Sequence, residues 1–158
     1  MKPERVFMEA AIEEARISAE QGDYAIGAVV VLNGEIIAKS GTLAQIRKNP
    51  VLHAEVAVIQ NATKKLNSQY LEGCILYTTH EPCPMCAAAA VWARMKGIVF
   101  GVRNGDMKAH AAKSENPKYS WRLIDVSCRE VLEKGKPALE LAEGFMREEC
   151  LRLFSLSR

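Results

Sequence analysis

The sequence has no long apolar run and no large excess of charge of either sign. A helix that spans a bilayer needs roughly 20 predominantly apolar residues, and no stretch of the chain meets that requirement. The 21 basic and 19 acidic side chains leave a net charge of +2, which is too small for a strong field toward a polyanion. The segment after Met1 passes into a mixed-charge helical pattern without the apolar core of a signal peptide. We therefore expect a cytoplasmic protein with no membrane contact, in which nucleic-acid binding is permitted but not indicated.

Cysteines are few, and their number is odd. Among the five, only Cys83 and Cys86 show a regular spacing, which is a C-x-x-C motif. This pattern excludes the disulfide framework of small secreted modules and predicts reduced thiols. The remaining cysteines are expected to be buried packing residues: Cys74, Cys128 and Cys150.

No linker, internal repeat or low-complexity tract divides the chain. Its 158 residues are close to the commonest domain size, and a hydrophobic content of 49% can supply one core. Residues 1–158 are therefore predicted to form a single domain.

Hydrophobic periodicity predicts helices that alternate with strands after an initial hairpin. Asn33-Gly34 separates the first two strands and is typical of a two-residue hairpin turn. The expected strands are 26–32, 35–38, 74–79, 97–102 and 121–126. The expected helices are 4–21, one that begins at Ala54 and ends in the polar region 61–69, 83–95 and 137–154, while 104–119 is ambiguous. This order predicts an α/β fold, a three-layer α/β/α sandwich with a mixed five-stranded sheet and helices on both faces.

Two short motifs combine the ligands and the acid of a hydrolytic zinc site. His53-Ala54-Glu55 stands at the start of the second helix, and Pro82-Cys83-Pro84-Met85-Cys86 opens the third. Two cysteines three positions apart in a first helical turn place both sulfurs on one side, where the helix dipole favours thiolates. One imidazole and two thiolates fill three tetrahedral positions and leave the fourth for water, which separates a catalytic zinc site from a structural one.

Glu55 is the predicted proton carrier of this site. Zinc lowers the pKa of a bound water toward neutrality, and a nearby acid must then move protons from the water to the substrate. Glu55 is two residues from a ligand and need not bind the metal, but burial would have to raise its pKa for both tasks. The backbone N–H groups of Ala54 and Cys83 could hold an exocyclic oxygen or a ring nitrogen of the substrate.

A lone C-x-x-C motif also occurs in redox pairs and in structural zinc half-sites. A structural site needs four protein ligands, yet there is no second C-x-x-C, and His80 and His110 lie outside ligand-like spacing. The histidine motif therefore favours a catalytic zinc site. Glu81, which precedes the third helix, is expected to cap that helix rather than to react.

The sequence resembles the cytidine deaminase-like superfamily, whose signature is H-x-E followed by P-C-x-x-C. Within it, the chain is similar to the branch of guanine deaminase, fungal-type cytosine deaminase and bacterial tRNA adenosine deaminase, from the first helix to about Asp106. The resemblance implies hydrolytic loss of an amino group from a nucleobase or nucleoside ring. It assigns Zn2+ to His53, Cys83 and Cys86, makes Glu55 the proton shuttle, and implies a homodimer.

The two ends of this resemblance favour different substrates. Trp92 in the third helix and Asp106 beyond the fourth strand are similar to guanine deaminases, in which an aromatic residue helps to enclose a small base. Segment 144–150 instead resembles the last helix of tRNA adenosine deaminases. We expect a guanine-like free base as substrate, with tRNA as the alternative, deaminated from adenosine to inosine at the wobble position. The alternative requires an open groove flanked by basic residues, for which the candidates are Arg47, Lys48, Arg94 and Arg103.

The proposed substrate contacts also have structural interpretations. Thr42 stands eleven residues before His53, where these branches commonly carry a base-reading asparagine, and its single hydroxyl cannot replace an amide's paired donor and acceptor. Thr42 is therefore either a contact of altered specificity or a plain loop residue. Trp92 is either a lid or a half-buried helix aromatic, and Asp106 is also a candidate turn or N-cap residue.

Overall fold

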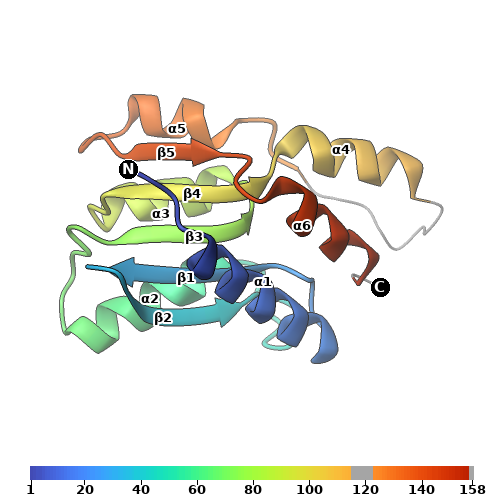
Figure 1. The fold of residues 1–158 in the computed structure, drawn as a ribbon, viewed down its shortest axis with the longest axis horizontal. Coiled ribbons are helices and arrows are strands. Elements are labelled where there is room, and N and C mark those ends of the chain that lie inside the picture. Colours follow the sequence, from blue (N-terminus) through green and yellow to red (C-terminus); the bar gives the residue numbers. More distant parts are fainter. Residues whose placement is uncertain (115–122, 157–158) are drawn as a thin grey trace.

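The computed structural model describes residues 1–114 and 123–156, in which five strands form one mixed sheet covered by helices on both faces (Figure 1). The sheet order is β2-β1-β3-β4-β5; β1 is antiparallel to β2 and β3, whereas β3, β4 and β5 are parallel. The strands are β1 (Gly27–Leu32), β2 (Glu35–Gly41), β3 (Ile75–His80), β4 (Gly97–Val102) and β5 (Glu140–Glu143). The helices are α1 (Arg5–Glu20), α2 (Ala54–Leu66), α3 (Pro84–Trp92), α4 (Asn104–Lys113), α5 (Cys128–Lys134) and α6 (Arg147–Leu151), followed by a 3-10 turn (Arg152–Ser155). The predicted three-layer α/β/α fold is confirmed.

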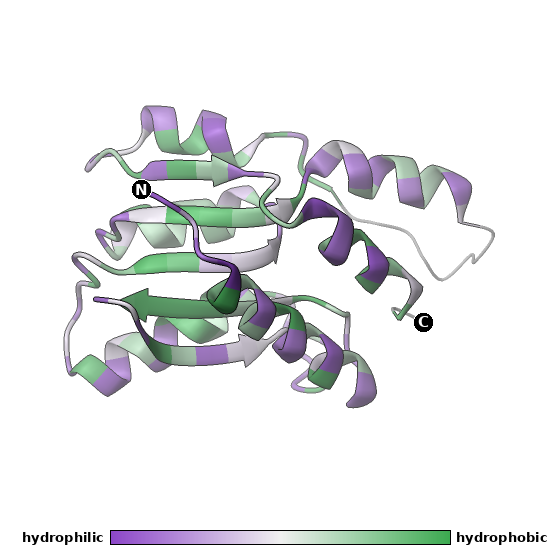
Figure 2. Ribbon diagram, viewed as in Figure 1, coloured by the Kyte–Doolittle hydropathy of each residue, from purple (hydrophilic) through white to green (hydrophobic). Residues whose placement is uncertain are grey.

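The two faces of the sheet support two separate hydrophobic cores. Alternate residues of a strand point to opposite faces, so Ala28 and Val30 of β1 pack with α2, α3 and α5, while Val29 and Val31 pack with α1 and α6. Figure 1 shows α1 and α6 in front of the sheet and α2 and α3 behind it. In Figure 2 the central strands are largely hydrophobic, as expected for strands covered on both faces.

The first helix lies unusually close to the hairpin because glycines face it. Gly27 and Gly41 are paired across β1 and β2. A Cβ atom at Gly27 would lie 2.1 Å from the carbonyl oxygen of Ala11, and one at Gly41 would lie 2.5 Å from Cβ of Ser18. The hairpin turn itself holds Asn33 and Gly34 at φ values of 51° and 79°, the conformation that the Asn-Gly pair predicts.

The C-terminal third departs from the predicted elements. The expected strand 121–126 begins outside the described residues, and its described part, 123–126, has no regular structure. The edge strand is instead β5, within the segment expected to be helix 137–154. Its residues favour a helix locally, but parallel pairing with β4 overrides that preference, and positive φ values at Gly144 (71°) and Met146 (53°) separate β5 from α6.

Two further helices complete this region. The part of the ambiguous segment 104–119 that is described contains α4, whereas 115–119 lie outside the described residues. Helix α5 was not predicted, although it begins with a capping box. The Ser127 side chain accepts a hydrogen bond from the Glu130 N–H, and the Glu130 carboxylate accepts one from the Ser127 N–H. No helix of the described chain is long and apolar enough to cross a membrane.

Candidate metal centre and active site

The predicted zinc ligands meet where two helix N-termini face the end of β3. His53 is the residue before α2, and Cys83 is the residue before α3, with Pro84 as the first helical residue. Neither His53 nor Cys83 caps its helix with its side chain, so both remain directed toward each other. Cys86 follows in the first turn of α3 and is fully buried.

The three donor atoms have the spacing of a tetrahedral zinc site. Nδ1 of His53 lies 3.6 Å from Sγ of Cys83 and 3.5 Å from Sγ of Cys86, and the two sulfurs are 3.6 Å apart. Ordinary Zn–S and Zn–N bond lengths at tetrahedral angles require separations of roughly 3.8 Å between sulfurs and roughly 3.6 Å between sulfur and nitrogen. These are the three clustered donors found among the described residues, so the set fits a zinc ion with one coordination position left over.

The electrostatics of the cluster favour thiolate at Cys83. Contact with Cys86 and with His53 lowers the pKa of Cys83 to about 4. The same Cys83 contact, followed by burial, raises the pKa of Cys86. Thiolate is the form that zinc binds, so the geometry and the charge state of Cys83 agree.

Glu55 lies beside this cluster with both oxygens in contact. Its carboxylate is 4% exposed; Oε1 accepts a hydrogen bond from the Thr78 hydroxyl at 3.0 Å, and Oε2 lies 3.6 Å from Sγ of Cys86. Burial raises the pKa of Glu55, as its predicted double task as base and acid requires. The carboxylate is thus close to the metal ligands without joining them.

A cavity of about 560 Å³ opens onto the cluster. It brings together the predicted His53, Ala54, Glu55 and Cys83 with Thr42. Thr42 is 2% exposed, and its hydroxyl donates to the carbonyl oxygen of Leu52 at 3.3 Å, so it is both a pocket residue and a loop anchor. The cavity is also lined by Tyr24, Ile26, Ala44, Gln45, Lys48, Asn49, Pro50, His80, Glu81, Asn104, Met107 and Leu123.

Trp92 does not line this cavity, and its side chain is 81% exposed. It is the last residue of α3, so the helical rise places it roughly 13 Å along the axis from Cys83. The interpretation of Trp92 as a lid over the pocket is therefore wrong for the described chain, and so is its alternative as a half-buried aromatic.

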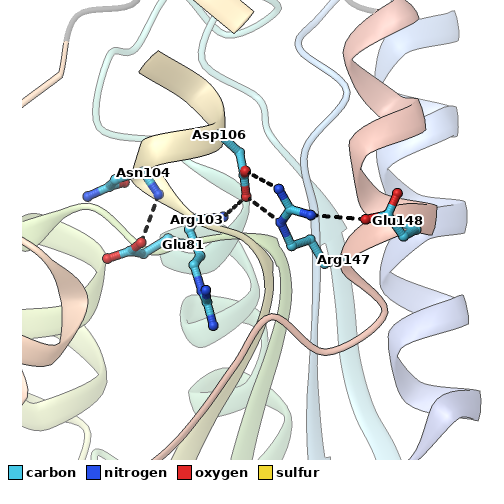
Figure 3. A network of polar contacts seen from close by, with 6 residues as sticks. All are labelled: Glu81, Arg103, Asn104, Asp106, Arg147 and Glu148. Carbon is cyan, nitrogen blue, oxygen red and sulfur yellow. Dashed lines mark hydrogen bonds and ion pairs between the residues drawn. The ribbon is translucent and has the colours of Figure 1, made fainter. Parts of the chain in front are cut away.

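Asp106 is likewise occupied elsewhere. It lies in the first turn of α4, where its carboxylate accepts the backbone N–H of Arg103 at 2.9 Å. Two guanidinium N–H groups of Arg147 donate to the same carboxylate at 2.5 and 3.0 Å (Figure 3). Asp106 therefore caps α4 and joins it to α6, which agrees with the capping interpretation rather than with a substrate contact.

Glu81 caps two helices, and neither of them is α3. Its Oε2 accepts the N–H of Asn104, the first residue of α4, at 2.8 Å (Figure 3), and its Oε1 accepts the N–H of Cys128, the first residue of α5, at 2.9 Å. The prediction that Glu81 caps α3 is wrong. Glu81 follows the end of β3, where its carboxylate lies beside the first residues of α4 and α5 instead. Sequence reasoning could not find these partners, which are 23 and 47 residues away.

Several pocket residues were missed in the sequence. Asn49 stands four residues before His53, and that proximity was the one available signal. His80 reaches the pocket from the last position of β3, where it packs edge-on against Phe154 with ring centroids 5.5 Å apart. Burial lowers the pKa of His80 to about 3, so this pocket residue is neutral at pH 7.

The basic residues expected to flank a groove are divided between two regions. Lys48 lines the cavity mouth. Arg94 instead lies with its guanidinium carbon 3.9 Å from the ring centroid of Tyr70 and pairs with Glu72, close to the N-terminal ends of β3 and β4. Arg94 is therefore removed from the cavity.

A buried glutamate beside a His-Cys-Cys donor set that borders a cavity defines a hydrolytic zinc site. The family profile described as the cytidine and deoxycytidylate deaminase zinc-binding region matches residues 1–102. The chain belongs to this family, which confirms the predicted superfamily, the deaminase class of hydrolase and zinc as cofactor.

Related proteins include deaminases of two substrate types. A tRNA-specific adenosine deaminase of Bacillus subtilis is 46% identical over 101 residues, which are 64% of this chain and 63% of that protein. A guanine deaminase of the same bacterium is 44% identical over 80 residues, which are 51% of each chain. The matched segments thus span less than two thirds of either relative.

Solved structures extend the likeness to nearly the whole chain. One comes from a study of A-to-I editing by tRNA:A34 deaminases at the wobble position; it is 33% identical, with a TM-score of 0.75, and the match covers 95% of this chain and 99% of that one. A guanine deaminase from Nitrosomonas europaea has a TM-score of 0.79 at 22% identity, covering 98% and 84%, and shows the shared fold.

Proposed function

We propose that this protein deaminates adenosine to inosine in tRNA. The observation that carries the proposal is the 33% identity to the tRNA:A34 deaminase structure over 95% of the chain, which includes the C-terminal region. In sequence, the guanine deaminase of Bacillus subtilis matches 51% of the chain, whereas the tRNA-specific adenosine deaminase of the same bacterium matches 64%. The substrate that we expected first, a guanine-like free base, is therefore less well supported than the alternative.

The pocket supports this order of preference. The residue expected to enclose a free base, Trp92, lies away from the cavity, and the cavity of about 560 Å³ offers more room than a purine ring fills. Lys48 at its mouth is a cation that could contact a nucleic-acid phosphate. RNA editing enzymes of this class draw one unstacked nucleotide into such a pocket.

The residues have distinct proposed roles in the reaction. His53, Cys83 and Cys86 would hold zinc, which supplies activation of water when bound. Glu55 takes a proton from the attacking water and passes it to the ring nitrogen next to the amine-bearing carbon. It later carries the remaining proton of the added hydroxyl to the departing amine. The Ala54 N–H, in the first turn of α2 and at the cavity wall, has no partner within the helix and can bind the substrate ring. Overall, water adds to C6 of adenine and ammonia leaves, which converts adenosine to inosine.

A substrate panel tests the proposal. Zinc-loaded protein is incubated with a tRNA anticodon stem-loop that carries adenosine at the wobble position, with free adenosine and with guanine, and inosine, xanthine and ammonia are measured. We expect inosine in the stem-loop, formed more slowly as salt rises because phosphate contacts weaken. Rapid, salt-independent release of xanthine from guanine without stem-loop conversion would overturn the proposal in favour of a free-base deaminase.

A further inference from the structure

Asp23 is a buried carboxylate that the deamination chemistry does not use. It lies in the connection between α1 and β1 and is 5% exposed. Its Oδ1 accepts the N–H of Tyr24 at 2.9 Å, and its Oδ2 accepts the N–H groups of Gln45 at 2.9 Å and Ile46 at 3.1 Å. The carboxylate thus joins two connections that lie 22 residues apart in sequence.

The segment that it holds is a helical turn between β2 and α2, which we call the rim turn (residues 43–49). The N–H of Arg47 donates to the Leu43 carbonyl, and the N–H of Asn49 donates to the Ala44 carbonyl, both at 2.9 Å. A helical turn leaves its first N–H groups without internal partners, and a polar residue just before it normally accepts from them. Leu43 occupies that place and cannot do so, so Asp23 supplies the cap from outside the turn.

The rim turn forms one wall of the cavity. Ala44, Gln45, Lys48 and Asn49 all line it. Lys48 has a φ value of 50°, a left-handed backbone conformation that is uncommon for residues other than glycine. The far side of the turn is closed by the Leu43 N–H, which donates to the Leu52 carbonyl at 3.0 Å, immediately before the ligand His53. The position of the cavity wall therefore depends on the bonds of Asp23.

We propose that Asp23 is a positioning residue for substrate binding, which caps the rim turn and so places Lys48 and Asn49 at the cavity mouth. The rim turn itself contributes neither the proton carrier Glu55 nor any of the three metal ligands. Loss of the cap should therefore weaken the binding of the substrate without slowing the chemical step. The choice of an RNA substrate for the test rests on the proposed function.

The test compares Asp23→Asn with wild type on the anticodon stem-loop. The asparagine amide has nearly the shape of the carboxylate, but it keeps only one acceptor oxygen. Its NH2 group cannot accept a hydrogen bond from a backbone N–H, so part of the cap is lost. We expect KM to rise about tenfold while kcat stays within about twofold and zinc content is unchanged. A matched control is Ile12→Val, a core change in α1 at a side chain that is 5% exposed, which should lower the melting temperature with no change in KM.

Backbone hydrogen exchange measures the stability of the hydrogen bonds in the rim turn independently of catalysis. In Asp23→Asn we expect faster exchange within residues 43–49 than in wild type or Ile12→Val, with no change in α3. Failure of wild type on the stem-loop would count against the proposed function, and the exchange result would still decide the role of Asp23. Unchanged exchange in the rim turn, or a fall in kcat at constant KM, would overturn the positioning role.

Discussion

The Thr78 hydroxyl donates a 3.0 Å hydrogen bond to the Glu55 carboxylate, which joins the middle layer of the fold to the helix that carries the proposed proton shuttle. Thr78 is fully buried in β3, and Glu55 is 4% exposed in the first turn of α2. The bond fixes one carboxylate oxygen and leaves the other on the side of Cys86. The orientation of the acid is therefore set by the sheet rather than by α2 alone.

Replacing Glu55 by glutamine should abolish turnover while zinc remains bound. The amide fills the same space but cannot carry a proton, so kcat should fall by about 10²- to 10⁴-fold. Ammonia release and metal content, measured on the same sample, check this prediction. The matched control is Glu13→Gln, a change at an exposed side chain of α1. Retention of more than a tenth of wild-type kcat would exclude Glu55 as the proton carrier.

Thr78→Val tests the orienting bond by itself. Valine keeps the volume of threonine but removes the donor, so the carboxylate loses its fixed position and kcat should fall about tenfold with little change in KM. Steady-state kinetics and the melting temperature should be measured together. Thr63→Val, in the last half of α2, is the control, and an equal loss of kcat in both variants would contradict a specific role for Thr78.

Cys86→Ser should lose zinc, whereas Cys74→Ala should keep it. Both cysteines are fully buried, but only Cys86 lies within the donor cluster, 3.5 Å from His53. Serine at neutral pH offers a protonated hydroxyl, which is a poor zinc ligand compared with thiolate. Metal analysis after dialysis should give about one equivalent for wild type and Cys74→Ala and much less for Cys86→Ser. Equal zinc content in the two variants would show that Cys86 is not a ligand.

The site was more predictable from sequence than its substrate. His53, Glu55, Cys83 and Cys86 stand in two short motifs, and local helix starts are enough to orient them. The pocket wall depends on the long connections and on how they cross. Asp23 and Glu81 each bond to N–H groups more than twenty residues away, and no periodicity marks such pairs.

The C-terminal region shows the same limit in the fold. Residues 140–143 have helical propensity but form an edge strand, because β4 offers a parallel partner that only the folded sheet provides. The same dependence on the folded chain applies to Trp92: its aromatic character predicts a lid, but its position at the far end of α3 keeps it out of the cavity lining.

The ion pair of Asp106 with Arg147 should stabilise the protein in a pH-dependent way. Hydrogen bonds from Arg147 lower the pKa of Asp106 below its ordinary value. A lowered carboxyl pKa stabilises the folded state at pH values above the ordinary Asp pKa of about 3.9, and this contribution is lost as the pH falls through the lowered value. Arg147→Gln should therefore reduce the free energy of unfolding at pH 7 by a modest amount, because solvent screens a partly exposed pair.

Urea unfolding of wild type, Asp106→Asn, Arg147→Gln and the double variant checks this ion pair. The double-variant cycle should give a coupling energy at pH 7 that shrinks toward zero in acid, as the pH falls through the lowered pKa of Asp106. Arg16→Gln on α1, whose guanidinium lies 3.6 Å from Glu13, removes an exposed pair and serves as the control, with a smaller effect at pH 7. A coupling energy that is equal at both pH values would mean that the contact between α4 and α6 is held by packing rather than by the charge on Asp106.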